Sequence, residues 1–81
     1  MEIAVLFLGL ARDLTGVEQF SLTLSNTSSV QALREVISVR FPRIKSALPT
    51  IRFAVNQVFV TDVHMLQEND EVAVIPPVSG G

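Results

Sequence analysis

The amino-acid sequence predicts an α+β roll, in which one main helix packs across a mixed sheet of four to five strands. Two short apolar runs at residues 3–8 and 20–24 have the pattern of strands, and residues 30–41 carry apolar side chains at helical spacing. Further short apolar runs follow as far as residue 75. A chain of 81 residues can bury one modest core, so we expect a single two-layer domain.

The first two strands are predicted from different patterns. Residues 3–8 are continuously apolar, which favours a central strand covered on both faces. The second run alternates instead, with Phe20, Leu22 and Leu24 on one face. We therefore expect a half-buried strand there, antiparallel to the first and joined to it by the segment 9–16.

The main helix is predicted to begin after the polar run 25–29. Ser28 and Gln31 have the spacing of a capping box, in which the serine accepts from a free backbone N–H and the glutamine reaches back. The expected buried stripe consists of Val30, Leu33, Ile37 and Phe41. Pro42 ends the helix near Phe41, because proline disfavours helical geometry in the residue before it.

Short strands complete the predicted sheet. Residues 51–55 and 58–60 flank Asn56-Gln57, and asparagine tolerates the positive φ of a tight turn. A second turn at residues 68–70 then leads to a last strand at residues 71–75.

The end of the chain differs in composition from the rest. Pro76-Pro77 gives a sheet no N–H, so we expect a folded domain at residues 1–75 and an extended, flexible tail at residues 76–81. Beyond the prolines come Val78, Ser79, Gly80 and Gly81. Two terminal glycines suit entry into a narrow pocket, so the predicted working groups are the Gly81 carboxylate and Gly80 beside it. The alternative is a frayed tail without function.

Composition argues against several classes of function. There is no cysteine and one histidine, so no thiolate or catalytic triad is available and no metal ligands are predicted. A formal charge of −2 argues against binding to nucleic acid. No apolar stretch reaches the ~18 residues of a membrane span, and the apolar start lacks the basic region of a secretory signal. The sequence therefore predicts a cytoplasmic protein that does not bind membranes.

Several segments of the chain match one known family. They are Val5-Leu6-Phe7, Ala11-Arg12-Asp13 with Gly16, Val30, Ala32-Leu33-Arg34, Ala54-Val55-Asn56-Gln57, Asn69-Asp70-Glu71-Val72-Ala73 and Ile75-Pro76-Pro77-Val78-Ser79-Gly80-Gly81. Over essentially its whole length the chain resembles the small, sulfur-carrying subunit of molybdopterin synthase, the MoaD family, with a ubiquitin-like β-grasp fold. The Asn56-Gln57 pair and the final six residues are the most specific matches. Asn69 stands where the family usually has glycine, and asparagine is the next best residue in a left-handed turn.

The resemblance implies a mechanism. A MoeB-like activating enzyme would use ATP to adenylate the Gly81 carboxylate, and a sulfur donor would convert it to a thiocarboxylate. The tail would then donate sulfur to the cyclic pterin precursor inside a MoaE-like large subunit, with which the chain is expected to form a heterotetramer. In this family the catalytic residues belong to the large subunit. The chain is therefore expected to bind no cofactor and to catalyse nothing alone.

The resemblance also implies a partner-binding set. Its members are Leu8, Phe59, Ile75, Pro76, Pro77, Val78 and Ser79. Leu8, Phe59 and Ile75 match positions of an apolar docking surface, whereas the other four belong to the inserted tail. Core packing is the alternative for the three apolar residues, because strand parity alone does not tell which face is outward.

Other functions remain compatible with the same fold. The carrier chemistry could serve thiamin thiazole synthesis or tRNA thiolation instead of the pterin. A non-activated ubiquitin-like interaction module would bind through its sheet and never use its tail. A conjugating modifier is a further alternative, although Lys45 is the sole lysine for building chains.

Overall fold

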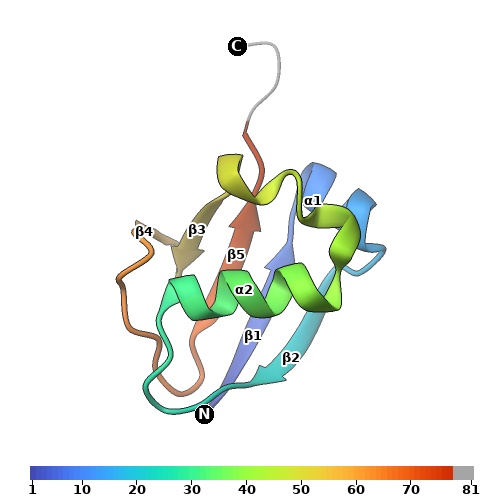
Figure 1. The fold of residues 1–81 in the computed structure, drawn as a ribbon. Coiled ribbons are helices and arrows are strands. Elements are labelled where there is room, and N and C mark those ends of the chain that lie inside the picture. The colour runs from blue at the N-terminus through green and yellow to red at the C-terminus, as the bar shows by residue number, and fades with distance from the viewer. Residues whose placement is uncertain (78–81) are drawn as a thin grey trace.

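The computed structural model describes residues 1–77 and has two layers, a sheet and a helix (Figure 1). The strands are β1 (Glu2–Phe7), β2 (Gln19–Thr23), β3 (Arg52–Val55), β4 (Val58–Val60) and β5 (Glu71–Ile75). The helices are α1 (Gly9–Thr15) and α2 (Val30–Arg40), with 3-10 turns η1 (Pro42–Ile44) and η2 (Leu48–Thr50). In Figure 1, α2 crosses one face of the sheet. None of the helices within residues 1–77 is long and apolar enough to cross a membrane.

The strands form one mixed sheet in the order β2-β1-β5-β3-β4. β1 and β5 run parallel, with Val5 opposite Val72, whereas the other neighbouring pairs are antiparallel. The prediction of a mixed sheet of four to five strands under one main helix is confirmed. Since β1 and β5 are parallel, their C-terminal ends lie at the same end of the molecule.

The strand β1 lies inside the sheet, but only one of its faces is covered. Ile3, Val5 and Phe7 are buried against the core, whereas Ala4 and Leu6 on the other face are half-buried. The expectation of a strand covered on both faces is therefore wrong. The second face of β1 is uncovered because the domain has a single helical layer, which leaves the opposite face of the sheet open (Figure 1).

The helix α2 begins at Val30, directly after the polar run as expected, and buries three of the four residues of the predicted stripe. Val30, Leu33 and Ile37 are fully buried, and the helix ends at Arg40 before Pro42. Phe41 is half-buried, and its ring meets Phe7 and Phe20 at centroid distances of 5.1 and 5.4 Å.

The predicted capping box is replaced by another arrangement. The N-cap is Ser29, whose side chain accepts from the N–H of Ala32 at 3.3 Å. Carbonyls of a later loop accept from the first helical amides, since Val30 N–H donates to His64 and Gln31 N–H to Asp62. The loop therefore satisfies the amides near the helix start, and Ser28 is buried outside the helix.

The hairpin β3–β4 turns through Asn56 and Gln57 with φ of 50° and 71°, as a two-residue hairpin requires. The Asn56 side chain also fixes the start of β5. Its amide donates to the Asp70 carboxylate at 2.9 Å, and its oxygen accepts from Glu71 N–H at 3.0 Å. The Asp70 carboxylate accepts in turn from Gln67 N–H at 2.8 Å. These bonds connect the two turns at one end of the sheet.

Candidate docking face beside the C-terminal tail

The three predicted docking residues lie on the same side of the sheet. On β5, Val72 and Val74 are buried toward α2, so Ile75 points to the opposite, open face. Leu8 directly follows the last residue of β1 and lies on the same side as Ala4 and Leu6, the outward residues of that strand. The Leu8 N–H donates to the Val74 carbonyl at 3.2 Å. Phe59 is paired with Ala54. Phe53, the residue before Ala54, belongs to the core, so Ala54 and Phe59 lie on the opposite, open side of the sheet.

Strand pairing arranges the open face in rows across the sheet. The row nearest the end of β5 contains Leu8, Ile75 and Arg52, because Arg52 is directly opposite Ile75. The next row contains Leu6, Ala73, Ala54 and Phe59. We call these seven residues the open-face patch. Six of its seven members are apolar, and one of these, Ala54, is buried. The first row borders the residues that lead into the tail.

The exposed fraction of each side chain tests the alternative of core packing. Phe59 is 52% exposed and Leu8 42% exposed, while Ile75 is half-buried. Side chains this open contribute little to the domain core, so core packing is wrong for Phe59 and Leu8. An exposed apolar group of this kind is typical of a surface that binds another molecule.

The base of the tail packs against the β1–α1 junction. Gly9 follows Leu8 with a φ of +50°, and a β-carbon added to it would lie 3.5 Å from Cγ of Pro76. Pro76 is half-buried there, whereas Pro77 is exposed. The predicted tail residues Val78, Ser79, Gly80 and Gly81 lie outside the described residues, so the tail as a separate unit stays a prediction.

Sequence reasoning missed four members of the patch. They are Leu6, Arg52, Ala54 and Ala73. The sequence predicts Leu6 in a strand covered on both faces, and it predicts Arg52 in a short strand at residues 51–55 without assigning it to a face. The signal that identifies Arg52 is its alternation with buried Phe53, which places the two on opposite faces.

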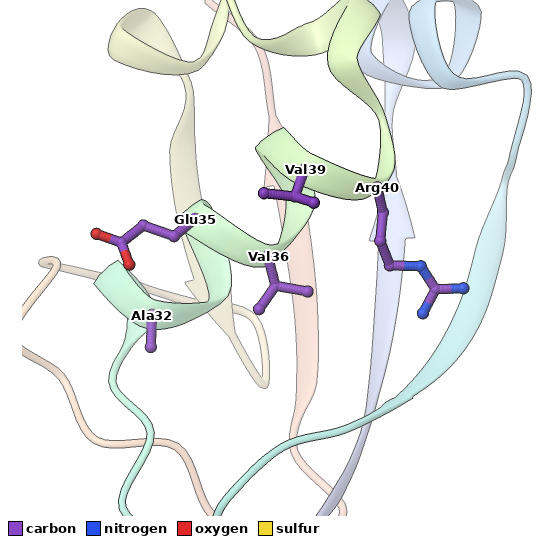
Figure 2. Close-up of a pocket in the computed structure, with 5 residues that line it drawn as sticks. All are labelled: Ala32, Glu35, Val36, Val39 and Arg40. Atoms are coloured by element: carbon purple, nitrogen blue, oxygen red, sulfur yellow. The ribbon is translucent and has the colours of Figure 1, made fainter.

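A metal centre and a pocket are the other kinds of site to consider among the described residues. Within residues 1–77, no three His, Cys, Asp or Glu side chains gather closely enough to hold a metal ion. A shallow depression lies on the other layer, along α2. It is lined by Ala32, Glu35, Val36, Val39 and Arg40 (Figure 2). Its two charged side chains, Glu35 and Arg40, point away from each other (Figure 2). The depression lies on the helix side of the sheet, away from the open-face patch.

Comparison with known families identifies the chain. The model of the ThiS family matches residues 5–81. The chain belongs to this ThiS/MoaD family. Among its members, a molybdopterin synthase sulfur carrier subunit of Arabidopsis thaliana is 36% identical over 100% of this chain and 84% of that protein. One of Escherichia coli is 37% identical over 98% of this chain and 99% of that protein.

Solved structures of related proteins have the same fold as this ThiS/MoaD chain. SAMP1 from Haloferax volcanii superposes with a TM-score of 0.91 at 17% identity, covering 100% of both chains. A putative molybdopterin converting factor subunit 1 from Pyrococcus furiosus gives 0.86 at 27% identity, covering 95% of this chain and 98% of that chain. A chain from a protein–protein complex of subunits 1 and 2 of the Helicobacter pylori molybdopterin-converting factor gives a TM-score of 0.75 at 23% identity. The match covers 100% of this chain and 100% of that chain. The predicted ubiquitin-like β-grasp fold is confirmed.

Proposed function

We propose that this chain is the sulfur carrier of molybdenum cofactor biosynthesis, the small subunit of a molybdopterin synthase. The observation that carries the proposal is the similarity to sulfur carrier subunits over the complete chain, at 36% identity in the Arabidopsis relative. The open-face patch supports it, because a carrier must dock its domain while its tail enters a partner. Leu8 and Ile75 belong to the row of that patch nearest Pro76, where the predicted tail begins.

The reaction proposed for the tail proceeds in two steps. The Gly81 carboxylate attacks the α-phosphorus of ATP in the activating enzyme, and pyrophosphate leaves. The acyl adenylate is then attacked by a sulfur donor at the hydrosulfide level, AMP leaves with the C–O bond electrons, and a thiocarboxylate remains. This sulfur is a better nucleophile than the original oxygen. In the synthase it would transfer to the cyclic pterin precursor.

The residues of this chain would contribute binding and positioning. Gly80 and Gly81 would let the acyl group enter a narrow active site, because neither carries a side chain. Pro76 and Pro77 would direct the exit, since proline restricts φ and favours an extended course. The acids, bases and cofactor-binding groups would belong to the partners, so the chain is not a catalyst alone.

Two partners are proposed for the same surface. One is the MoaE-like large subunit, and the complex of subunits 1 and 2 in the Helicobacter pylori relative is the precedent that supports it. A heterotetramer of two small and two large subunits is the proposed assembly. The other partner is a MoeB-like activating enzyme. The proposed location of the reaction is the cytoplasm, where ATP is available.

The test measures the intact mass of the purified protein after incubation with ATP, activating enzyme and a sulfur donor. We expect the mass to increase by the difference between one sulfur and one oxygen, and a variant lacking Gly81 to remain unchanged while it still folds. An unchanged wild-type mass, under conditions that thiolate a known carrier, would contradict the proposal. The mass also checks that the active chain ends at Gly81.

Adding an acceptor distinguishes the carrier functions. With the large subunit and pterin precursor present, the thiocarboxylate should return to the carboxylate as molybdopterin forms. Transfer only to a thiazole precursor or to tRNA would assign the chain to one of those pathways. An interaction module would show neither the mass change nor a requirement for Gly81.

A further inference from the structure

The open-face patch contains one cation, and its position is unusual for an apolar surface. Arg52 lies in the row nearest the tail, opposite Ile75. Its guanidinium carbon is 4.0 Å from the centroid of the Phe59 ring. Such stacking restricts the flat guanidinium over the aromatic face and leaves its N–H groups able to bind an acceptor.

Nothing within the described part of the chain neutralises this cation. In residues 1–77 the ion pair found is Arg34–Asp62, which lies elsewhere, and Arg52 is exposed. The acidic side chains of the open face are Glu71 and Glu2, which follow in rows farther from the tail. The open face is thus positive beside the tail and negative at its far end.

Docking would change the environment of Arg52. Phe59 is the most exposed apolar side chain of the patch, so a partner that uses the patch covers this ring. Covering the ring also removes water from the guanidinium stacked on it. A cation that loses its water without gaining a partner is strongly unfavourable. A bidentate carboxylate is the acceptor that fits a guanidinium best.

We propose that the large subunit presents an Asp or Glu side chain to Arg52 beside the apolar residue that covers Phe59. This inference rests on the proposed function and adds the chemistry of the partner's surface. The resulting pair would also set the orientation of docking. In the reversed orientation the partner's carboxylate would face Glu71 and Glu2, and the tail would point away from the active site.

The first experiment measures the dissociation constant for the molybdopterin synthase large subunit of the same organism by titration calorimetry. We expect Arg52→Gln to weaken binding about 30-fold or more, and Arg52→Glu by a larger factor, since the pair would be desolvated. The wild-type affinity should fall at high salt more steeply than that of Arg52→Gln.

The chain offers a matched control. Arg40 is also exposed and stacks on an aromatic ring, with its guanidinium carbon 5.2 Å from the Phe20 centroid, but it belongs to the helix layer. Arg40→Gln makes the same change of charge and should leave the dissociation constant within about threefold of wild type. Thermal melting of both variants checks that they fold.

A second experiment identifies the acceptor directly. Lys45 is the sole lysine, so Arg52→Lys introduces one new amine at the docking face. A carbodiimide should join that amine to an Asp or Glu of the large subunit, as found by mass spectrometry, and wild-type protein should lack this link. Equal affinity of wild type and Arg52→Glu, or no link from position 52 to a carboxylate, would overturn the inference. Failure of wild-type protein to bind the large subunit would instead contradict the proposed function.

Discussion

Gly9 and Pro76 lie against each other where the last strand leaves the domain, with 3.5 Å between Cγ of Pro76 and the place a β-carbon on Gly9 would take. The contact joins the β1–α1 junction to the base of the tail. Leu8 precedes this glycine and belongs to the open-face patch. The turn at Gly9 therefore contacts Pro76 and also follows Leu8, a predicted docking residue.

Replacing Gly9 by valine should both destabilise the domain and displace the tail base. A residue other than glycine at φ of +50° costs about 1–2 kcal/mol, and the branched side chain would also press on Pro76. Denaturant unfolding measures the loss. Gly16→Val is the control, because Gly16 has φ of +72° but nothing within 4 Å of its added β-carbon. Equal losses in the two variants would contradict a role for the Pro76 contact.

Phe59→Ala should separate binding from folding. The ring is 52% exposed, so we expect a loss in unfolding free energy below about 1 kcal/mol. Affinity for the large subunit should fall about 30-fold or more, as for an aromatic anchor at the centre of an interface.

The neighbouring Val58 provides the control for Phe59. It is 63% exposed on the same strand but has the opposite parity. Val58→Ala should change the dissociation constant by less than about threefold. If both variants weaken binding equally, the open face is not the docking surface.

Removing the buried carboxylate of Asp70 should lower the free energy of unfolding more than removing an exposed polar side chain nearby. Asp70→Ala leaves the Asn56 amide and the Gln67 N–H without their acceptor, which costs about 1–3 kcal/mol. Thermal and denaturant unfolding measure the loss. Gln67→Ala, at an exposed position just before the same turn, keeps the backbone N–H that donates to Asp70 and should cost less than about 0.5 kcal/mol. A loss from Asp70→Ala as small as that from Gln67→Ala would contradict this role of the carboxylate.

The layered fold was predictable because its signals are local. Helical spacing at Val30, Leu33 and Ile37 and the turn at Asn56-Gln57 each specify one element without reference to the rest of the chain. The N-cap was predicted one residue early, at Ser28 instead of Ser29, because the arrangement of the helix start depends on a distant loop. The carbonyls of His64 and Asp62 accept hydrogen bonds from the first amides of the helix, which a capping box would have satisfied in part.

The candidate site was predictable only in part, for a related reason. The family resemblance located Leu8, Phe59 and Ile75, but the face to which a strand residue points follows from pairing across the sheet. Arg52 was missed because its stacking partner Phe59 lies on the next strand. An alternating pattern places a residue on a face, whereas only the register shows which neighbour it meets.

The position of β5 between β1 and β3 determines how the domain resists a force applied at its C-terminal end. A partner that grips the tail pulls along the axis of a strand bonded on both edges, parallel to β1 and antiparallel to β3. Such a load shears two ladders at once, so several hydrogen bonds must break together before the strand slides. In the proposed carrier function, tension on the C-terminal end would therefore leave β5 paired in the sheet.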